Sequence, residues 1–336
     1  MKMKEDFRME LEQIGRIRGR KKQIWEDFLR RADLEPDENL EKTVLVWDGE
    51  DLVATGSRQG NLLKCIAVDE SRQGEGITAT LITALRQDAF ASDQRHLFLY
   101  TKPQNEFMFS SLFFYPVARS GKVLLMESRK DGVREFVDSL PRTAVGGKIG
   151  AAVMHCNPFT LGHRYLVESA AGECDHLYVF VLSEEGGMFS APDRMEMVKA
   201  GTADLPNVTV LPTGPYLISS ATFPSYFLKD KENLPAIQCR LDIEVFTRYF
   251  APKLGITHRF VGSEPFSPST AMYNRALADH LPPAGIQVKE LPRLEKDGLA
   301  VSARAVRALL EEGRKAEAAL RLPRTTVDIL QQKGYL

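Results

Sequence analysis

The second half of the chain is organised by short, uniformly apolar runs that alternate with helix-like segments. A strand that is apolar at every position is typical of a parallel strand buried on both faces, because a half-exposed strand would alternate. Strands of this kind separated by helices predict a doubly wound, Rossmann-like parallel sheet, which we expect over residues 148–336. The apolar runs are 149–154, 177–182, 208–211 and 259–261.

Residues 1–142 have a different texture, with short β-prone runs separated by turn signals. Asp48-Gly49 stands between two such runs, and glycine accepts the positive φ that a tight hairpin needs. Another run, 62–68, leads into a glycine-containing turn and then a helical pattern. We therefore expect a separate mixed α+β domain over 1–142, with the segment 131–148 as the passage between domains.

Composition and charge exclude several classes of protein. Apolar residues make up 43% and charged residues 26% of the 336 positions, which is ordinary for a soluble globular protein. The 45 acidic and 44 basic residues nearly cancel, so no bulk field attracts nucleic acid or a membrane, and we expect neither as a partner. The charged start of the chain lacks a signal-peptide core, so we expect a cytoplasmic protein. Its four cysteines are scattered and predict no metal site.

The segment 154–163 follows the first apolar run and opens a predicted helix that ends at Gly172. It therefore lies at the carboxyl end of a parallel strand and at a helix N-terminus, where amide donors and the helix dipole favour phosphate. Gly162 has no Cβ, so we expect a nucleotide to approach the backbone there. Thr160 and His163 share one face of the first turn, and His163 can donate to a phosphate oxygen that gains charge in the transition state.

The sequence Thr160-Leu161-Gly162-His163 resembles the T/H-x-G-H signature of the nucleotidylyltransferase superfamily. Members of that superfamily attack the α-phosphate of ATP and release pyrophosphate. Asn157 stands where many of them have the aspartate of an Asp-Pro pair. The resemblance implies catalytic roles for His163 and Thr160, and ATP contacts from Asn157, Phe159 and Gly162.

A second segment, 301–307, resembles the S-S-T-x-I-R block with which the same superfamily holds the β- and γ-phosphates. Ser302 is a good N-cap for the helix that follows, and Gly313 is a good end for it. Arg304 stands where a threonine is usual. We expect Ser302 to take part in ATP binding, with phosphate contact from Arg304 or Arg307.

Two further segments are predicted to lie at the same edge of the sheet. Arg194 is near the start of a helix, and the corresponding superfamily helix often offers a basic residue to the triphosphate. Gly262 and Ser263 end a predicted strand, which places them near the adenine or ribose, with Glu264 facing substrate or magnesium.

The first domain carries a loop, 73–78, between the run 62–68 and a helix. It resembles the Q/R-x-x-G-x-G/A loop of the GNAT acetyltransferase fold, whose amides hold the pyrophosphate of coenzyme A. The usual GNAT tyrosine acid is not found beside the second motif, so a fold retained for binding is at least as compatible with the sequence as an active acetyltransferase. The resemblance implies contacts to a coenzyme-A-like or pantetheine group from Gln73, Gly74, Gly76, Thr78 and Asn105.

A GNAT-like domain followed by a Thr-x-Gly-His domain resembles the [citrate (pro-3S)-lyase] ligase family over the whole chain. The most specific pieces are 156–163 and 262–266. The resemblance implies that acetate attacks the α-phosphate of ATP, giving acetyl-adenylate and pyrophosphate, with magnesium expected. The acetyl group then passes to the thiol of a dephospho-coenzyme-A-derived prosthetic group on the acyl carrier subunit of citrate lyase, which activates that enzyme.

Two alternatives stay open at this point. An adenylyltransferase of cofactor biosynthesis, acting on a pantetheine phosphate or nicotinamide mononucleotide, would use the same nucleotide site but make a dinucleotide-type product. A coenzyme A or nucleotide sensor would bind without turnover.

Overall fold

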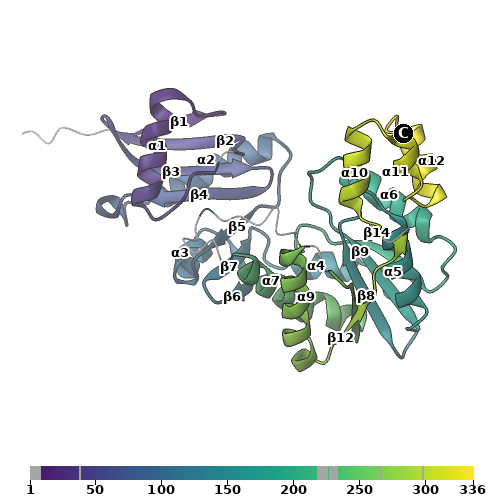
Figure 1. Ribbon diagram of the computed structural model, residues 1–336. Coiled ribbons are helices and arrows are strands. Elements are labelled where there is room, and N and C mark those ends of the chain that lie inside the picture. The colour runs from purple at the N-terminus through teal and green to yellow at the C-terminus, as the bar shows by residue number, and fades with distance from the viewer. Residues whose placement is uncertain (1–8, 38, 218–225, 227–233, 265–266, 297–298) are drawn as a thin grey trace, which may run out of the picture. The chain divides into compact units, whose positions relative to one another are not determined.

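The computed structural model describes residues 9–37, 39–217, 226, 234–264, 267–296 and 299–336 (Figure 1). By its contacts the chain divides into two compact units, Met1–Gly132 with Pro224–Ile237, and Val133–Phe223 with Gln238–Leu336. A helix, α4 (Gly132–Ser139), begins the segment expected as the passage between domains. The division into domains 1–142 and 148–336 stays a prediction.

The first unit is built on a mixed seven-stranded sheet of order β1-β2-β3-β4-β5-β7-β6. Strands β4 and β5 pair in parallel, whereas the other neighbours pair antiparallel. The predicted Asp48-Gly49 hairpin is confirmed, with Gly49 at a φ of 62°. The strands are β1 (Glu10–Ile14), β2 (Lys42–Asp48), β3 (Asp51–Gln59), β4 (Leu62–Val68), β5 (Phe98–Thr101), β6 (Tyr115–Ser120) and β7 (Val123–Glu127).

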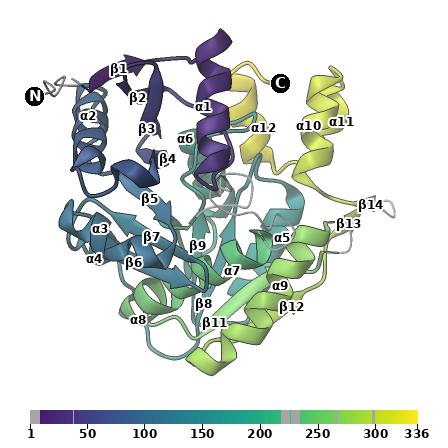
Figure 2. The ribbon, with the colours of Figure 1, turned by 90° about the vertical axis from the view of Figure 1, so that its left-hand side faces the viewer.

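Helices α1 (Gly19–Arg31) and α2 (Ile77–Ala91) lie on opposite faces of this sheet (Figure 2). The indole of Trp25, in α1, donates to Thr55 Oγ1 at 3.0 Å. The next residue, Gly56, has Leu85 of α2 against the position of its absent Cβ, at 3.1 Å. Successive residues of a strand point to opposite faces, so each helix covers one side. A short helix, α3 (Glu106–Ser111), precedes β6.

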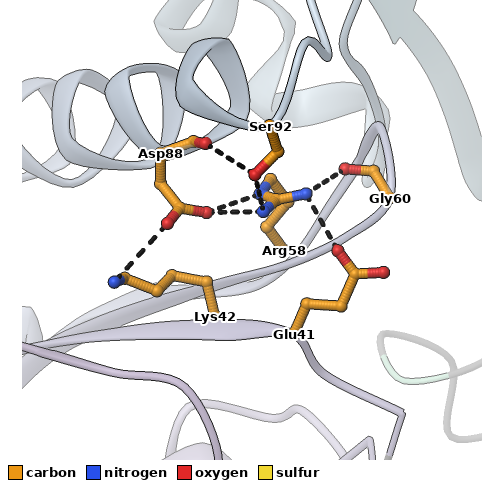
Figure 3. A network of polar contacts seen from close by, with 6 residues as sticks. All are labelled: Glu41, Lys42, Arg58, Gly60, Asp88 and Ser92. Atoms are coloured by element: carbon orange, nitrogen blue, oxygen red, sulfur yellow. Dashed lines mark hydrogen bonds and ion pairs between the residues drawn. The ribbon is translucent and has the colours of Figure 1, made fainter.

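A buried guanidinium fastens strand β3 to helix α2 (Figure 3). Arg58 is 3% exposed, and its Nε and Nη2 donate to Asp88 Oδ2 at 2.8 and 2.6 Å. Two N–H groups of one guanidinium thus share a single carboxylate oxygen, and hydrogen bonds between charged groups are stronger than those between neutral groups. The remaining acceptors of Arg58 are Glu41 Oε2, the Gly60 carbonyl and Ser92 Oγ.

The second unit is built on a five-stranded sheet of order β10-β9-β8-β11-β12, in which every neighbouring pair is parallel. The chain starts in the middle at β8, adds strands on one side, and then crosses to the other. The carboxyl ends of β8 and β11 therefore form a topological switch point, where open α/β sheets bind ligands. The strands are β8 (Ile149–Met154), β9 (His176–Val181), β10 (Val208–Pro212), β11 (His258–Gly262) and β12 (Gln287–Leu291).

The helices of the second unit connect these strands. The predicted helix after β8 is confirmed as α5 (Leu161–Ala171), which ends at Gly172, and the helix after Ser302 is confirmed as α10 (Ala303–Glu311). No helix in the described residues is long and apolar enough to cross a membrane. The predicted fold class, a mixed α+β domain followed by a doubly wound parallel sheet, is confirmed. The other elements are α6 (Ala191–Thr202), α7 (Leu234–Val245), α8 (Ala251–Leu254), α9 (Pro268–His280), α11 (Lys315–Ala319), α12 (Arg324–Gln332), β13 (Glu295–Lys296) and β14 (Leu299–Ala300).

Candidate functional site

Thr160 and His163 are bonded to each other at the start of helix α5. Thr160 is the N-cap, with extended backbone, and its hydroxyl oxygen accepts from the His163 amide at 3.4 Å. The Thr160 amide in turn donates to His163 Nδ1 at 3.0 Å, which completes a capping box. The predicted pair is thus brought together, and the cap fixes the orientation of the imidazole.

The protonation of His163 follows from this cap. Because Nδ1 accepts the Thr160 amide, the proton of the neutral ring is assigned to Nε2. Burial, with Arg293 and His155 nearby, lowers the pKa of His163 to about 4. The buried ring of Phe159 stacks on the imidazole at a centroid distance of 5.9 Å. His163 is therefore a neutral side chain at pH 7 whose Nε2–H is a donor.

The absent side chain of Gly162 makes room for another part of the chain. A Cβ built at Gly162 would lie 2.6 Å from the carbonyl oxygen of Val301. The space left by the absent side chain is therefore taken by the chain just before α10, not left for a nucleotide. The amide of Leu161 donates to the Arg321 carbonyl at 3.0 Å. Among the first-turn amides in the described residues, that of Gly162 has no protein acceptor.

Asn157 and Phe159 support the loop from within. Asn157 is 4% exposed, and its Oδ1 accepts from the Phe189 amide at 3.2 Å. The Asn157 carbonyl accepts from Arg307 Nη1 at 2.5 Å. This bond, like the contact of Gly162 with Val301, joins the segment 154–163 to the segment 301–307. Phe159 lies in the hydrophobic core with no exposed surface. The structure therefore places both side chains behind the loop, where they hold its shape.

Arg194 does not reach the exposed face of the site. It has no exposed surface, and Nη1 donates to the carbonyls of Leu182 at 2.9 Å and His155 at 3.2 Å. Its Nη2 donates to the carbonyl of Glu184. These donors bond to backbone oxygens of the loops after β8 and β9, and the ATP contact of Arg194 stays a prediction.

The segment after β11 joins the site through Arg293. Gly262 accepts from Asn274 at its carbonyl, and Ser263 Oγ accepts from the Arg293 amide at 3.2 Å. Glu264, predicted to face substrate or magnesium, is paired with Arg293, with Oε2 2.6 Å from Nη2. Its other oxygen accepts from the Ser267 amide at 3.1 Å.

Two residues of the site were missed by sequence reasoning, Arg293 and His155. Arg293 follows the end of β12 and is near enough to His163 to lower its pKa. His155 directly follows β8, and its Nε2 is 3.9 Å from Glu184 Oε1, too far for a hydrogen bond. Burial lowers the pKa of His155, with contributions from Arg194 and Arg307. Both residues follow the carboxyl ends of parallel strands. The strand β8 could be predicted from its apolar sequence, whereas β12 is polar and was not predicted.

Ser302 and Arg304 lie at the start of α10. Ser302 is the N-cap, as predicted, and its Oγ accepts from the Ala305 amide at 3.2 Å. Arg304 is exposed, whereas Arg307 is partly buried. Within the described part of the chain, no group of three or more His, Cys, Asp or Glu side chains is arranged to hold a metal ion.

The residues predicted to contact a coenzyme-A-like group line one cavity of the first unit. The cavity has a volume of about 800 Å³ and opens between β4, β5 and the start of α2. Gly74 and Gly76 adopt φ values of 88° and 78°, which only glycine adopts without strain, so the loop turns tightly into α2. The predicted residues brought together here are Gln73, Gly74, Gly76, Thr78 and Asn105.

Fold and site together define the class: a doubly wound α/β domain with a capped, neutral histidine at its switch point, in one chain with a mixed α+β domain. Residues 149–330 match the family described as the citrate lyase ligase C-terminal domain. The chain is 41% identical to [citrate [pro-3S]-lyase] ligase of Klebsiella pneumoniae over 91% of both chains. It is 39% identical to the enzyme of that name in Haemophilus influenzae, over 97% of this chain and 99% of the relative.

The chain therefore belongs to the [citrate [pro-3S]-lyase] ligase family and is a ligase enzyme. A shorter segment of 56 residues, 16% of the chain, is 39% identical to phosphopantetheine adenylyltransferase of Dehalococcoides mccartyi. The predicted family resemblance is confirmed.

Proposed function

We propose that this ligase activates citrate lyase by acetylating the thiol of the prosthetic group on its acyl carrier subunit, with ATP converted to AMP and pyrophosphate. The observation that carries the proposal is the neutral His163 at the switch point, with Nε2–H as donor and Arg293 beside it, in a chain of this family. A cytoplasmic location belongs to the same proposal.

In the first half-reaction a carboxylate oxygen of acetate attacks the α-phosphorus of ATP. The bond from that phosphorus to the bridging oxygen breaks, and pyrophosphate leaves with the electron pair. Negative charge grows on the phosphate oxygens, and donors already in place stabilise it without reorganisation. The donors are His163 Nε2–H and the Gly162 amide.

The arginines serve the same step by neutralising charge on the triphosphate. Arg304 is exposed at the start of α10, and Arg307 lies against the first motif through the Asn157 carbonyl. Magnesium enters as the counter-ion of ATP, because Mg²⁺ is commonly held by substrate phosphates with few protein carboxylates. This fits a site whose nearby carboxylate, Glu264, is bonded to Arg293.

In the second half-reaction the thiol sulfur attacks the acetyl carbon of acetyl-adenylate. The bond from that carbon to the phosphate oxygen breaks, AMP leaves, and the thiol proton is lost to solvent. We assign the cavity of the first unit to the pantetheine part of the prosthetic group, with its diphosphate at the amides of the 73–78 loop. The support is the shared cavity of the five predicted residues and the two positive-φ glycines.

To test this proposal, the protein is mixed with ATP, magnesium and acetate, with and without deacetylated citrate lyase. The amounts of AMP and pyrophosphate formed and the activity of the lyase are then measured. The variant is His163→Asn, whose side-chain oxygen can still accept the Thr160 amide while the outer donor is lost. We expect AMP formation to fall by about 10²–10³-fold, as for removal of one preorganised donor. The matched control is His280→Asn, on the exposed end of α9.

Acetate-dependent AMP formation that rises with deacetylated lyase, and lyase that becomes active, are the expected results. Pyrophosphate release that ignores acetate, or a dinucleotide-type product in place of AMP, would overturn the proposal.

A further inference from the structure

The cavity of the first unit ends in a fork between two strands. Strands β4 and β5 are paired in parallel at Leu62 with Phe98 and at Leu63 with Leu99. Beyond these pairs the strands separate, and Ile66, Ala67 and Val68 on one side and Tyr100 and Thr101 on the other line the cavity. The gap between the two strands therefore narrows toward Leu63 and Leu99. We call this the blind end of the cavity.

A tyrosine from a distant part of the chain occupies this fork. The hydroxyl of Tyr226 donates to the carbonyl of Tyr100, in β5, at 3.1 Å and lies 3.5 Å from the carbonyl of Leu63, in β4. Tyr226 is 6% exposed and forms part of the cavity wall. The phenol therefore sits where the next ladder hydrogen bonds between the two strands would have formed.

Tyr226 is held at its backbone as well. Its carbonyl accepts from the Glu35 amide at 2.6 Å, just after α1. The backbone is held at Glu35 and the hydroxyl at the strand carbonyls, so the side chain cannot swing aside without losing its hydroxyl bonds. Burial also raises the pKa of the phenol well above its usual value, so the hydroxyl stays protonated as a donor to the strand.

We propose that Tyr226 closes the blind end of this cavity and makes it select the free thiol form of a pantetheine arm over its acylated forms. The inference rests on the proposed function, since it takes the cavity to hold that arm. An arm whose diphosphate lies at the 73–78 loop extends along the gap between the two strands toward the phenol. The sulfur reacts with acetyl-adenylate outside this cavity. An acetyl group on the sulfur then meets the ring of Tyr226 when the arm returns, so the acylated product is held less tightly than the thiol substrate.

Calorimetric titration of the full chain with coenzyme A, acetyl-coenzyme A and butyryl-coenzyme A tests this assignment. We expect the wild type to bind coenzyme A at least about tenfold more tightly than butyryl-coenzyme A, as a closed apolar wall discriminates by added methylenes. Tyr226→Ala should reduce that ratio to within about threefold, while Tyr226→Phe, which keeps the ring, should retain most of it. Tyr226→Leu serves if the alanine variant does not fold, because it keeps apolar volume and shortens the side chain.

Equal affinity of the wild type for the three compounds would overturn the role of Tyr226 and leave the arm site standing. So would an unchanged ratio in a folded Tyr226→Ala or Tyr226→Leu protein. If the wild type binds none of the three, the assignment of the cavity to a pantetheine arm fails, and the inference fails with it.

Discussion

The absent side chain of Gly162 and the carbonyl oxygen of Val301 share one space: a Cβ at Gly162 would lie 2.6 Å from that oxygen. This contact, with the Arg307 bond to the Asn157 carbonyl, holds the start of α10 against the start of α5. The two motifs that the sequence shows far apart are therefore parts of one surface.

Gly162→Ala is expected to separate these motifs. The added methyl forces the backbone at Val301 to move, and overpacking of this kind costs about 1–3 kcal/mol in the free energy of unfolding. We also expect a fall in AMP formation, because the donors at α5 and the cations at α10 lose their common orientation. Urea denaturation and the AMP assay measure the two effects. Gly146→Ala, where nothing lies within 4 Å of the new Cβ, is the control. A fully active, equally stable Gly162→Ala protein would contradict the account.

Arg194→Met is expected to loosen the loops after β8 and β9. The change leaves the carbonyls of His155, Leu182 and Glu184 without their donor. A hydrogen bond to a charged group contributes about 1.5–3 kcal/mol to stability. We expect the free energy of unfolding to fall by about 3 kcal/mol, the contribution of one or two such bonds. Arg324→Met, whose side chain is 83% exposed, should change stability little. If Arg194→Met altered only the KM for ATP and left stability unchanged, the structural role would be contradicted and the predicted phosphate contact supported.

The acid sensitivity of the second unit should contain a contribution from His163. Its pKa is lowered to about 4 in the folded chain, against an ordinary 6.5. Between these values the unfolded chain binds more protons, so stability is present above pH 6.5 and is lost as the pH falls toward 4. The difference corresponds to about 3 kcal/mol. His163→Asn should remove this part of the pH dependence, and NMR titration of the imidazole reads the pKa directly. A midpoint near 6.5 would contradict the assigned environment.

Arg304 and Arg307 should separate into different roles. Arg304 is exposed, so Arg304→Ala should weaken ATP binding and leave the unfolding free energy within about 0.5 kcal/mol. Arg307 donates to the Asn157 carbonyl, so Arg307→Ala should weaken binding and also lower stability by about 1–2 kcal/mol. Calorimetric ATP titration and urea denaturation measure both quantities. Equal effects of the two changes on stability would show that Arg307 is not part of the loop's support.

Much of this architecture is readable from the sequence because the features are local. The strand β8 was predicted at its observed bounds, since its six residues form one uninterrupted run of apolar residues and glycine. The capping box needs two residues three apart, and both were identified. Strand β12 was missed because it is an edge strand with the polar sequence Gln-Val-Lys-Glu-Leu, which carries no signal of burial.

The contacts that the sequence did not indicate are made with residues far away along the chain. Nothing local to Arg194 indicates that three carbonyls surround it, and nothing local to Gly162 indicates that Val301 lies against it. Tyr226 reaches a fork between β4 and β5 from a part of the sequence beyond β10. Such contacts are set by tertiary packing, which periodicity and spacing do not encode.

In the proposed reaction, acetate attacks the α-phosphorus of ATP at the His163 site. Acetate labelled with ¹⁸O at both oxygens, turned over with ATP and deacetylated citrate lyase, tests it most directly when the AMP is analysed by mass spectrometry. We expect one ¹⁸O atom in the phosphate of each AMP, because the attacking oxygen stays on phosphorus when the acetyl group moves to the thiol. AMP free of label, or label found in pyrophosphate or inorganic phosphate, would contradict it.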